Sequence, residues 1–220
     1  MSFDQSPQYR PLIFGVTRVK LRDGAPGTHY LQADQPLLPY PERMTDRLQH
    51  WAETVPARSF MARRVRQPDG SLGDWKHVSY GEAWQTARRI AQAILDRGLS
   101  VERPVVILSE NGLEHALLSL GCLIAGVPFV QTSPAYSLIS QDYDKLRHVI
   151  NTVTPGLLFA SDAARYGKAL QAVATPEMEL VLVEGELSGL VSTSFDALCA
   201  TPETPAVDAA MAATGPDTIT

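Results

Sequence analysis

Short apolar segments alternate with helix-like segments between residues 80 and 199, and this alternation restricts the chain to few folds. Apolar residues recur at helical spacing from Tyr80 to Leu95, which predicts an amphipathic helix, and Gly98 follows at the position that favours a left-handed residue. Such alternation predicts right-handed βαβ units, that is, an α/β fold with a mainly parallel sheet flanked by helices. We predict the further helices over 113–126, 140–151 and 162–173, and the strands at 104–108, 127–130, 157–160 and 180–183.

The chain divides by composition into three parts. Residues 1–42 contain six prolines and three glycines, which predicts an extended lead-in with turns. Residues 43–200 are predicted to form the α/β subdomain, which opens with a helix capped by Thr45 and a hairpin of strands at 59–64 and 75–78. Residues 201–220 are dominated by Ala, Thr and Pro, which predicts a linker at the end of an incomplete domain.

Charge and cysteine content exclude several classes of protein. The chain carries a net charge of −5 without a basic run that has interleaved aromatic residues, so we expect no nucleic-acid partner. Cys122 and Cys199 lie far apart with no histidine cluster nearby, which predicts no disulfide, no metal site and a reducing, cytoplasmic setting. The longest apolar stretch, Ala116–Val130, is interrupted by glycines and a proline and is shorter than the roughly 20 residues of a membrane span, so we expect no membrane insertion.

Motifs that mark common catalytic sites are absent from the sequence. It contains no G-x-x-x-x-G-K-[ST], no G-x-G-x-x-G, no G-x-S-x-G and no H-E-x-x-H. The five histidines are scattered along the chain. We therefore assign no catalytic residue within these 220 residues.

Two groups of residues are candidates for ligand binding. Arg165 and Lys168 lie three positions apart on one predicted helix face, where they could hold a phosphate or simply face solvent. The other group is a hydroxyl-rich loop at the carboxyl end of a predicted strand, where open α/β sheets place their ligands. Its alternative role is to cap the next helix. The loop runs from Phe129 to Ser137, and its candidate binding residues are Phe129, Val130, Gln131, Thr132 and Ser133.

Several segments, taken in order, resemble the opening of the AMP-dependent acyl-CoA synthetases, which are adenylate-forming enzymes. The resemblance is carried by VSYGEAW (78–84), LDRGL (95–99), PVVILSENGLEHALLSLGCLIAGVPFV (104–130) and SPAYSL (133–138). Within that superfamily the chain looks most like feruloyl-CoA synthases, on YPERMTDRLQHWAETVPARSF (40–60), LSENGLEHALL (108–118) and SPAYSLISQDYDKLRHVI (133–150). The resemblance extends from about residue 8 to residue 220.

The resemblance implies that the chain is the N-terminal third of an AMP-forming acyl-CoA ligase. The complete enzyme would use ATP, Mg²⁺ and coenzyme A to convert an aromatic carboxylic acid first into an acyl-adenylate and then into a CoA thioester. The family's ATP-phosphate loop, a Thr/Ser/Gly-rich stretch followed by Pro-Lys, would follow Thr220. We therefore expect this span to be inactive alone and to work with the remainder of the ligase chain.

The resemblance also implies roles for the two candidate groups. In acetyl-CoA synthetases, which are similar in architecture, two basic residues of the corresponding helix hold a phosphate of coenzyme A, and these positions fall on Arg165 and Lys168. A lysine at the second position loses bidentate contact. The loop from Phe129 to Ser133 would lie close to the coenzyme A nucleotide. The non-catalytic alternative is a truncated product or an interaction module with a flavodoxin-like α/β fold.

Overall fold

The computed structural model describes residues 18–67 and 69–220, which belong to two units that divide between Tyr40 and Pro41. In the first unit, β1 (Val19–Asp23) and β2 (His29–Ala33) pair as an antiparallel hairpin. This hairpin lies within the segment that composition predicts to be an extended lead-in. The predicted lead-in over residues 1–17 lies outside the described residues.

The second unit opens with α1 (Met44–Thr54) and an antiparallel hairpin of β3 (Ser59–Arg66) and β4 (Leu72–Ser79). The helix begins one residue before the predicted cap. Asp46 in its first turn accepts hydrogen bonds from the backbone N–H of Arg43 at 3.2 Å and from its Nε at 2.8 Å, and Thr45 is buried instead of capping. The predicted hairpin is confirmed, with both strands longer than expected.

The helix predicted from Tyr80 is α2 (Tyr80–Asp96). At its start, Ser79 Oγ accepts from the Glu82 N–H at 3.2 Å, and the Glu82 carboxylate accepts from the Ser79 N–H at 2.8 Å. This reciprocal pair satisfies two of the backbone donors that a helix start leaves free. At its end, Gly98 has a φ of +60°, the left-handed conformation that the sequence predicts there.

Five strands form the central sheet, and every neighbouring pair in it is parallel. Their order is β6-β5-β7-β8-β9, so numbering these strands along the chain gives the order 2-1-3-4-5 that is typical of flavodoxin-like sheets. The predicted α/β class with a parallel sheet is confirmed. The strands are β5 (Val105–Leu108), β6 (Phe129–Gln131), β7 (Leu157–Asp162), β8 (Glu179–Glu184) and β9 (Ser192–Ser194).

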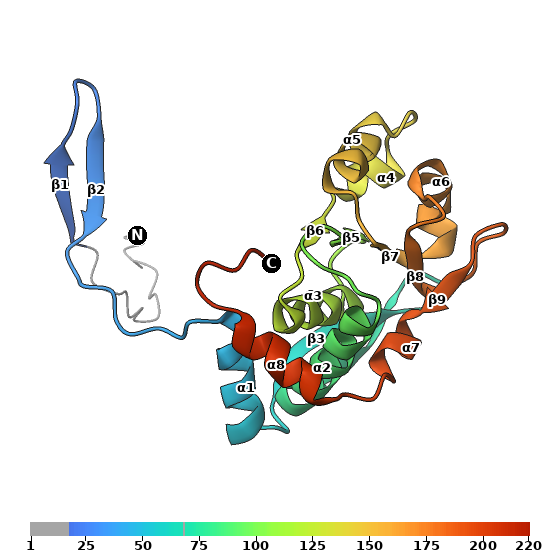
Figure 1. The fold of residues 1–220 in the computed structure, drawn as a ribbon, viewed down its shortest axis with the longest axis horizontal. Helices are drawn as coiled ribbons and strands as arrows, with labels where there is room; N and C mark the ends of the chain where they lie inside the picture. The colour runs from blue at the N-terminus through green and yellow to red at the C-terminus, as the bar shows by residue number, and fades with distance from the viewer. Residues whose placement is uncertain (1–17, 68) are drawn as a thin grey trace, which may run out of the picture. The chain divides into compact units, whose positions relative to one another are not determined.

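Helices cover both faces of this sheet, as Figure 1 shows. Successive strand residues point to opposite faces, so Ile107 belongs to one buried cluster and Leu108 to another. The first cluster packs under α2, α3 (Leu113–Ala125), α7 (Phe195–Cys199) and α8 (Pro205–Ala213), and the second under α5 (Asp144–Val153) and α6 (Ala163–Val173), with α4 (Pro134–Leu138) beside them. Among the residues described, no helix is long and apolar enough to cross a bilayer.

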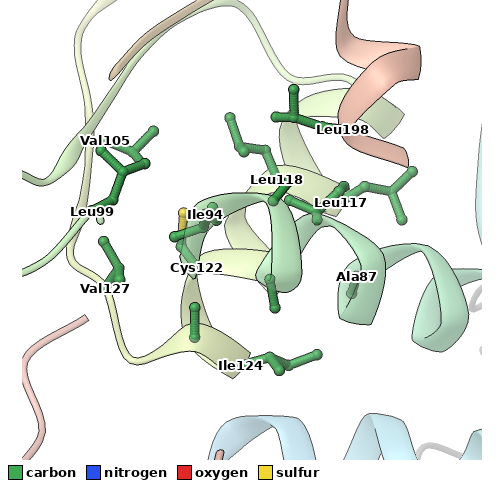
Figure 2. Packing of buried hydrophobic residues seen from close by; sticks show 14 of the residues in the cluster. Ala87, Ile94, Leu99, Val105, Leu117, Leu118, Cys122, Ile124, Val127 and Leu198 are labelled. Atoms are coloured by element: carbon green, nitrogen blue, oxygen red, sulfur yellow. The ribbon is translucent and has the colours of Figure 1, made fainter. Parts of the chain in front are cut away.

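The helices α2 and α3 pack closely because Gly121 leaves room between them. A Cβ at Gly121 would lie 2.4 Å from Cγ2 of Ile90 and 3.3 Å from the carbonyl oxygen of Ala87. Figure 2 shows the side chains that gather here, among them Leu118 and Cys122 of α3.

Residues 201–220 differ from the predicted linker because they contain α8. Thr204 caps this helix by accepting from the Ala206 N–H at 3.3 Å, and Val207 and Met211 are buried. The Arg88 guanidinium of α2 binds Glu203 at 2.5 Å and Asp208 at 2.7 Å. Tertiary contacts therefore order a stretch whose composition suggests none.

Two smaller differences concern the segment after β6. The predicted hydroxyl-rich loop contains the short helix α4. The helix expected to start at Ser140 instead begins at Asp144, after Tyr143 in a left-handed conformation with a φ of 59°. Ser140 still contributes, since its Oγ accepts from the Tyr143 N–H at 3.0 Å and donates to Asp142 at 2.9 Å.

Candidate functional site

The carboxyl ends of β6, β5 and β7 meet at one edge of the sheet because the three strands are parallel neighbours. The helix after β5, α3, packs on one face, whereas the helix after β7, α6, packs on the other. The chain thus departs in opposite directions from two adjacent strands. This is the topological switch point at which open α/β sheets bind ligands.

A cavity of about 590 Å³, which we call the edge cavity, lies at this end of the sheet. It adjoins a more apolar cavity of about 310 Å³ that reaches Phe60 and Met61 of β3 and shares Asn111, His115 and Gln131 with it. The edge cavity is lined by the last residue of β6 and by residues that follow β5 and β6. These lining residues are Ser109, Glu110, Asn111, His115, Gln131, Thr132, Ser133 and Pro134.

Thr132 fixes the end of β6 against β5. Its backbone N–H and its Oγ1 both donate to the carbonyl oxygen of Ile107, each at 3.1 Å, and the side chain is buried. Gln131 and Ser133, on either side of it, are exposed at the cavity. Of the predicted loop, Gln131 and Ser133 are therefore the side chains free to contact a ligand.

His115 is the titratable residue at the inner wall of both cavities. Its Nδ1 lies 3.2 Å from Ser109 Oγ and 3.3 Å from the carbonyl oxygen of Glu110. Burial lowers the pKa of the imidazole, and the Glu110 carbonyl opposes this only in part. The ring is therefore a neutral hydrogen-bonding group at neutral pH.

An ion pair joins the two sides of the switch point. Nη1 of Arg165, in the first turn of α6, lies 2.6 Å from Oε2 of Glu110 in the loop after β5. This contact with Arg165 lowers the pKa of the Glu110 carboxyl, and the same contact raises the pKa of the guanidinium. Both side chains are about half exposed, so the pair lies at the surface where a solute can reach it.

Asp162 has a different role from that of Glu110. Its carboxylate caps α6 by accepting from the backbone N–H groups of Ala164 at 2.7 Å and Arg165 at 3.3 Å. Lys168, one turn further along α6, is exposed. Within residues 18–67 and 69–220 no ion pair or hydrogen bond of its side chain is present.

The structure separates the predicted site residues into three groups. Arg165 lies at the carboxyl edge of the sheet, with Lys168 one turn further along α6, while Gln131, Thr132 and Ser133 line the edge cavity. Phe129 and Val130 do not line it: Phe129 packs against the cluster under α2 and α3, and Val130 against the cluster under α5 and α6.

Comparison with known proteins identifies the family. Residues 48–214, more than half of the chain, match the family model described as AMP-binding enzyme. The chain belongs to this family. The malpinin synthetase of Mortierella alpina is 30% identical over 154 residues, which are 70% of this chain and 2% of that protein.

Two solved structures show the fold that this AMP-binding family member shares. The fatty acid AMP ligase of Legionella pneumophila superposes on 74% of this chain with a TM-score of 0.54 at 18% identity, using 26% of its own length. The A-PCP didomain of the carboxylic acid reductase from Segniliparus rugosus, in complex with AMP, superposes on 76% with a TM-score of 0.58 at 15% identity, using 28% of its length. The chain thus spans only a small part of the proteins it matches.

Sequence reasoning missed part of the site in this AMP-binding chain. Ser109, Glu110, Asn111 and His115 line the edge cavity, but they were not predicted to bind a ligand. The available signal was the position of Ser-Glu-Asn directly after the apolar strand Val105–Leu108, at a carboxyl end. The described residues hold no group of three or more His, Cys, Asp or Glu side chains suited to a metal ion.

Proposed function

We propose that this chain is the part of an AMP-forming acyl-CoA ligase that contacts coenzyme A. The single observation that carries the proposal is the position of Arg165, with its guanidinium at the switch point of the sheet beside the edge cavity. Coenzyme A bears a 3′-phosphate and a diphosphate, and a guanidinium binds phosphate through charge-assisted, often bidentate hydrogen bonds. Membership of the AMP-binding family makes ligase chemistry the context for this phosphate site.

In this proposal each residue of the site has a defined task. Arg165 donates to a phosphate of coenzyme A, and Lys168 adds a point charge one turn away on the same helix. Gln131 and Ser133 offer polar side chains at the cavity, held in place because Thr132 ties β6 to β5. Phe129 and Val130 anchor the strand by packing against the two cores on opposite faces of the sheet, and they do not touch the ligand.

The complete enzyme would perform two half-reactions. ATP and a carboxylic acid give an acyl-adenylate and pyrophosphate, and the thiol of coenzyme A then displaces AMP. We propose that the acid is aromatic, of the hydroxycinnamic type, on the basis of the resemblance to feruloyl-CoA synthases. The similarity to a fatty acid AMP ligase and a carboxylic acid reductase supports a carboxylic acid substrate in general.

We propose that ATP and Mg²⁺ are bound outside these 220 residues, so the span alone does not form an acyl-adenylate. The support is the absence of a Thr/Ser/Gly-rich stretch followed by Pro-Lys from the sequence. A pyrophosphate-release assay with ATP and ferulate checks this, and turnover above a buffer blank would contradict it. A reducing, cytoplasmic setting belongs to the same proposal, because Cys122 and Cys199 are both unpaired.

The proposal is tested with Arg165→Ala/Lys168→Ala in a full-length ligase chain that contains this span. We expect the apparent KM for coenzyme A to rise about five- to thirty-fold, given the strength of charge-assisted contacts and their screening by solvent. Adenylation, followed by pyrophosphate release without coenzyme A, should stay nearly unchanged because only the second half-reaction uses that ligand.

The matched control is Arg47→Ala/Arg89→Ala, which removes two exposed cations from α1 and α2, away from the switch point. This control should leave both half-reactions as they are. If Arg165→Ala/Lys168→Ala also keeps its coenzyme A kinetics, the two residues simply face solvent. A parent chain without any adenylation would favour the non-catalytic interaction module.

A further inference from the structure

The Glu110–Arg165 pair connects segments that are far apart in sequence at the position where a ligand is expected. The two residues lie 55 positions apart, one in the loop after β5 and one at the start of α6. Glu110 also lines the edge cavity. The Glu110 carboxylate therefore occupies the position on the Arg165 guanidinium at which, in the proposed function, a phosphate binds.

This pair is poorly placed to stabilise the fold. The side chain of Arg165 is 49% exposed and that of Glu110 is 55% exposed, and ion pairs in such positions contribute little to stability. The other carboxylate near Arg165, that of Asp162, is already engaged with the backbone of α6. Glu110 is thus the exchangeable partner of the guanidinium.

Further positive charge surrounds Glu110. Nη1 of Arg63 lies next to Gly112, where it would be 3.3 Å from an added Cβ. Arg63 and Arg66 of β3 join Arg165 in lowering the pKa of the Glu110 carboxyl. A carboxylate carries one negative charge, whereas a phosphate monoester carries about 1.5 to 2 and three acceptor oxygens. A phosphate is therefore a better match for this cationic surrounding than the glutamate that now fills it.

We propose that Glu110 is an internal competitor for the phosphate site: its carboxylate holds Arg165 until a phosphate of coenzyme A displaces it. This inference rests on the function proposed above and adds a specificity-determining residue to it. A ligand must displace the Glu110 carboxylate from Arg165 before it can bind. A singly charged carboxylate gains nothing over Glu110 and is rejected, whereas a phosphate group, with more negative charge, is accepted. The opposite role, in which Glu110 positions Arg165 for the ligand, predicts weaker binding once the carboxylate is removed.

The test is Glu110→Gln in the same full-length ligase chain, with coenzyme A binding measured by isothermal titration calorimetry. Gln keeps the shape and an acceptor oxygen but removes the charge. We expect coenzyme A to bind about two- to five-fold more tightly, the range for relieving competition from one exposed ion pair. The gain in coenzyme A affinity should disappear in the Arg165→Ala background, because Glu110 competes with the ligand only for Arg165.

The matched control is Glu114→Gln, which removes the same charge four residues away, where Glu114 pairs with Lys76 at 3.3 Å. This variant should change coenzyme A affinity less than two-fold. If Glu110→Gln binds coenzyme A no more tightly than Glu114→Gln does, or more weakly than the parent, Glu110 is no competitor and the inference is wrong. The proposed function fails separately, when Arg165→Ala/Lys168→Ala binds coenzyme A as tightly as the parent does.

Two further ligands identify the phosphate concerned. If the gain from Glu110→Gln is lost with dephospho-CoA, the 3′-phosphate displaces Glu110, and if the gain persists, the diphosphate does. ATP serves as the third probe and should show the same KM in the variant and the parent. An equal gain for ATP would overturn the assignment to coenzyme A.

Discussion

The two faces of the central sheet are built differently. On the face under α2 and α3 the buried polar group Gln92 is fully engaged: its Oε1 accepts from the N–H and Oγ1 of Thr204 at 2.9 and 2.8 Å, and its Nε2 donates to Asp96 at 2.7 Å. On the face under α5 and α6, two hydroxyl groups, Ser137 Oγ and Tyr166 Oη, are buried without a hydrogen-bond partner in the described part of the chain.

We interpret this difference as a separation between the face that stabilises the fold and the face that carries the proposed ligand site. The α2–α3 face has close helix contacts, and none of its described buried side-chain N or O atoms lacks a hydrogen-bond partner, as expected of a region that holds the fold together. The α5–α6 face tolerates unpaired hydroxyls, and its helix α6 supplies Arg165 to the surface site. If this interpretation is correct, substitutions should cost more on the first face than at matched positions on the second.

The largest effect is expected for Phe159→Ala. Phe159 is fully buried in the α2–α3 face and meets Phe195 edge to face, with ring centroids 5.6 Å apart. Loss of the ring should lower the free energy of unfolding by about 3–5 kcal/mol, measured by urea titration of the 220-residue chain. The neighbour Leu158, on the same strand and equally buried, points to the other face, so Leu158→Ala gives the direct comparison. A larger loss for Leu158→Ala would reverse our assignment of the two faces.

Gly121→Ala should have the next largest effect. The new Cβ would meet Cγ2 and Cβ of Ile90 at 2.4 and 2.8 Å and the carbonyl oxygen of Ala87 at 3.3 Å, so two helices must move apart. We expect a loss of about 1–3 kcal/mol in unfolding free energy, typical of an overpacked core.

Gly167 of α6 is the matched position on the other face. A Cβ there would meet only the tip of Leu187, with Cδ2 at 2.7 Å, and a leucine tip can rotate away. Because alanine favours helix over glycine, Gly167→Ala should be neutral or stabilise by up to about 1 kcal/mol. Equal losses for the two glycine variants would contradict the proposed difference in packing.

Local features of the fold could be predicted from sequence, and long-range ones could not. The start of α2 at Ser79 and its end before Gly98 follow from short motifs whose partners are three residues apart or fewer. In contrast, α8 depends on contacts between Arg88 and acidic residues more than 110 positions away. The strand β9, Ser-Thr-Ser, has no apolar residue and forms because β8 provides a parallel partner.

The candidate site follows the same rule. The position of a polar loop after β6 could be predicted because the apolar run before it marks a strand end. That Gln131 and Ser133 face the cavity while Phe129 and Val130 face the two cores depends on the strand's register with β5, which the sequence does not display. The role proposed for Glu110 could not be predicted, because it depends on Arg165, which lies 55 positions away in the sequence and contacts Glu110 only in the fold.

Tyr166→Phe tests whether the α5–α6 face contains a buried hydroxyl group without a hydrogen-bond partner. Tyr166 is fully buried under α6, its hydroxyl has no partner, and burial is the main cause that raises its pKa. Removing a buried hydroxyl that makes no hydrogen bond should leave stability unchanged or raise it by up to about 1 kcal/mol. Tyr136→Phe, at a half-buried tyrosine of α4, is the control for loss of a phenol as such. A loss above 0.5 kcal/mol for Tyr166→Phe, an order-of-magnitude threshold, would indicate that this hydroxyl is satisfied after all.

The smallest effect is a pH dependence of stability that arises from His115 at the edge cavity and not from either buried core. Burial holds the pKa of His115 below the ordinary value of about 6.5, so the unfolded chain binds a proton that the folded chain does not. The free energy of unfolding is therefore not reduced by His115 above about pH 6.5. It decreases as the pH falls below that value, with a slope of at most about 1.4 kcal/mol per pH unit.

His115→Asn keeps a nitrogen donor near Ser109 and the Glu110 carbonyl but cannot titrate. Urea midpoints of this variant, measured between pH 7.5 and about pH 5, should therefore lose this slope. His50→Asn, at an exposed histidine of α1, should retain the slope, and an unchanged slope in His115→Asn would assign the titration to another group.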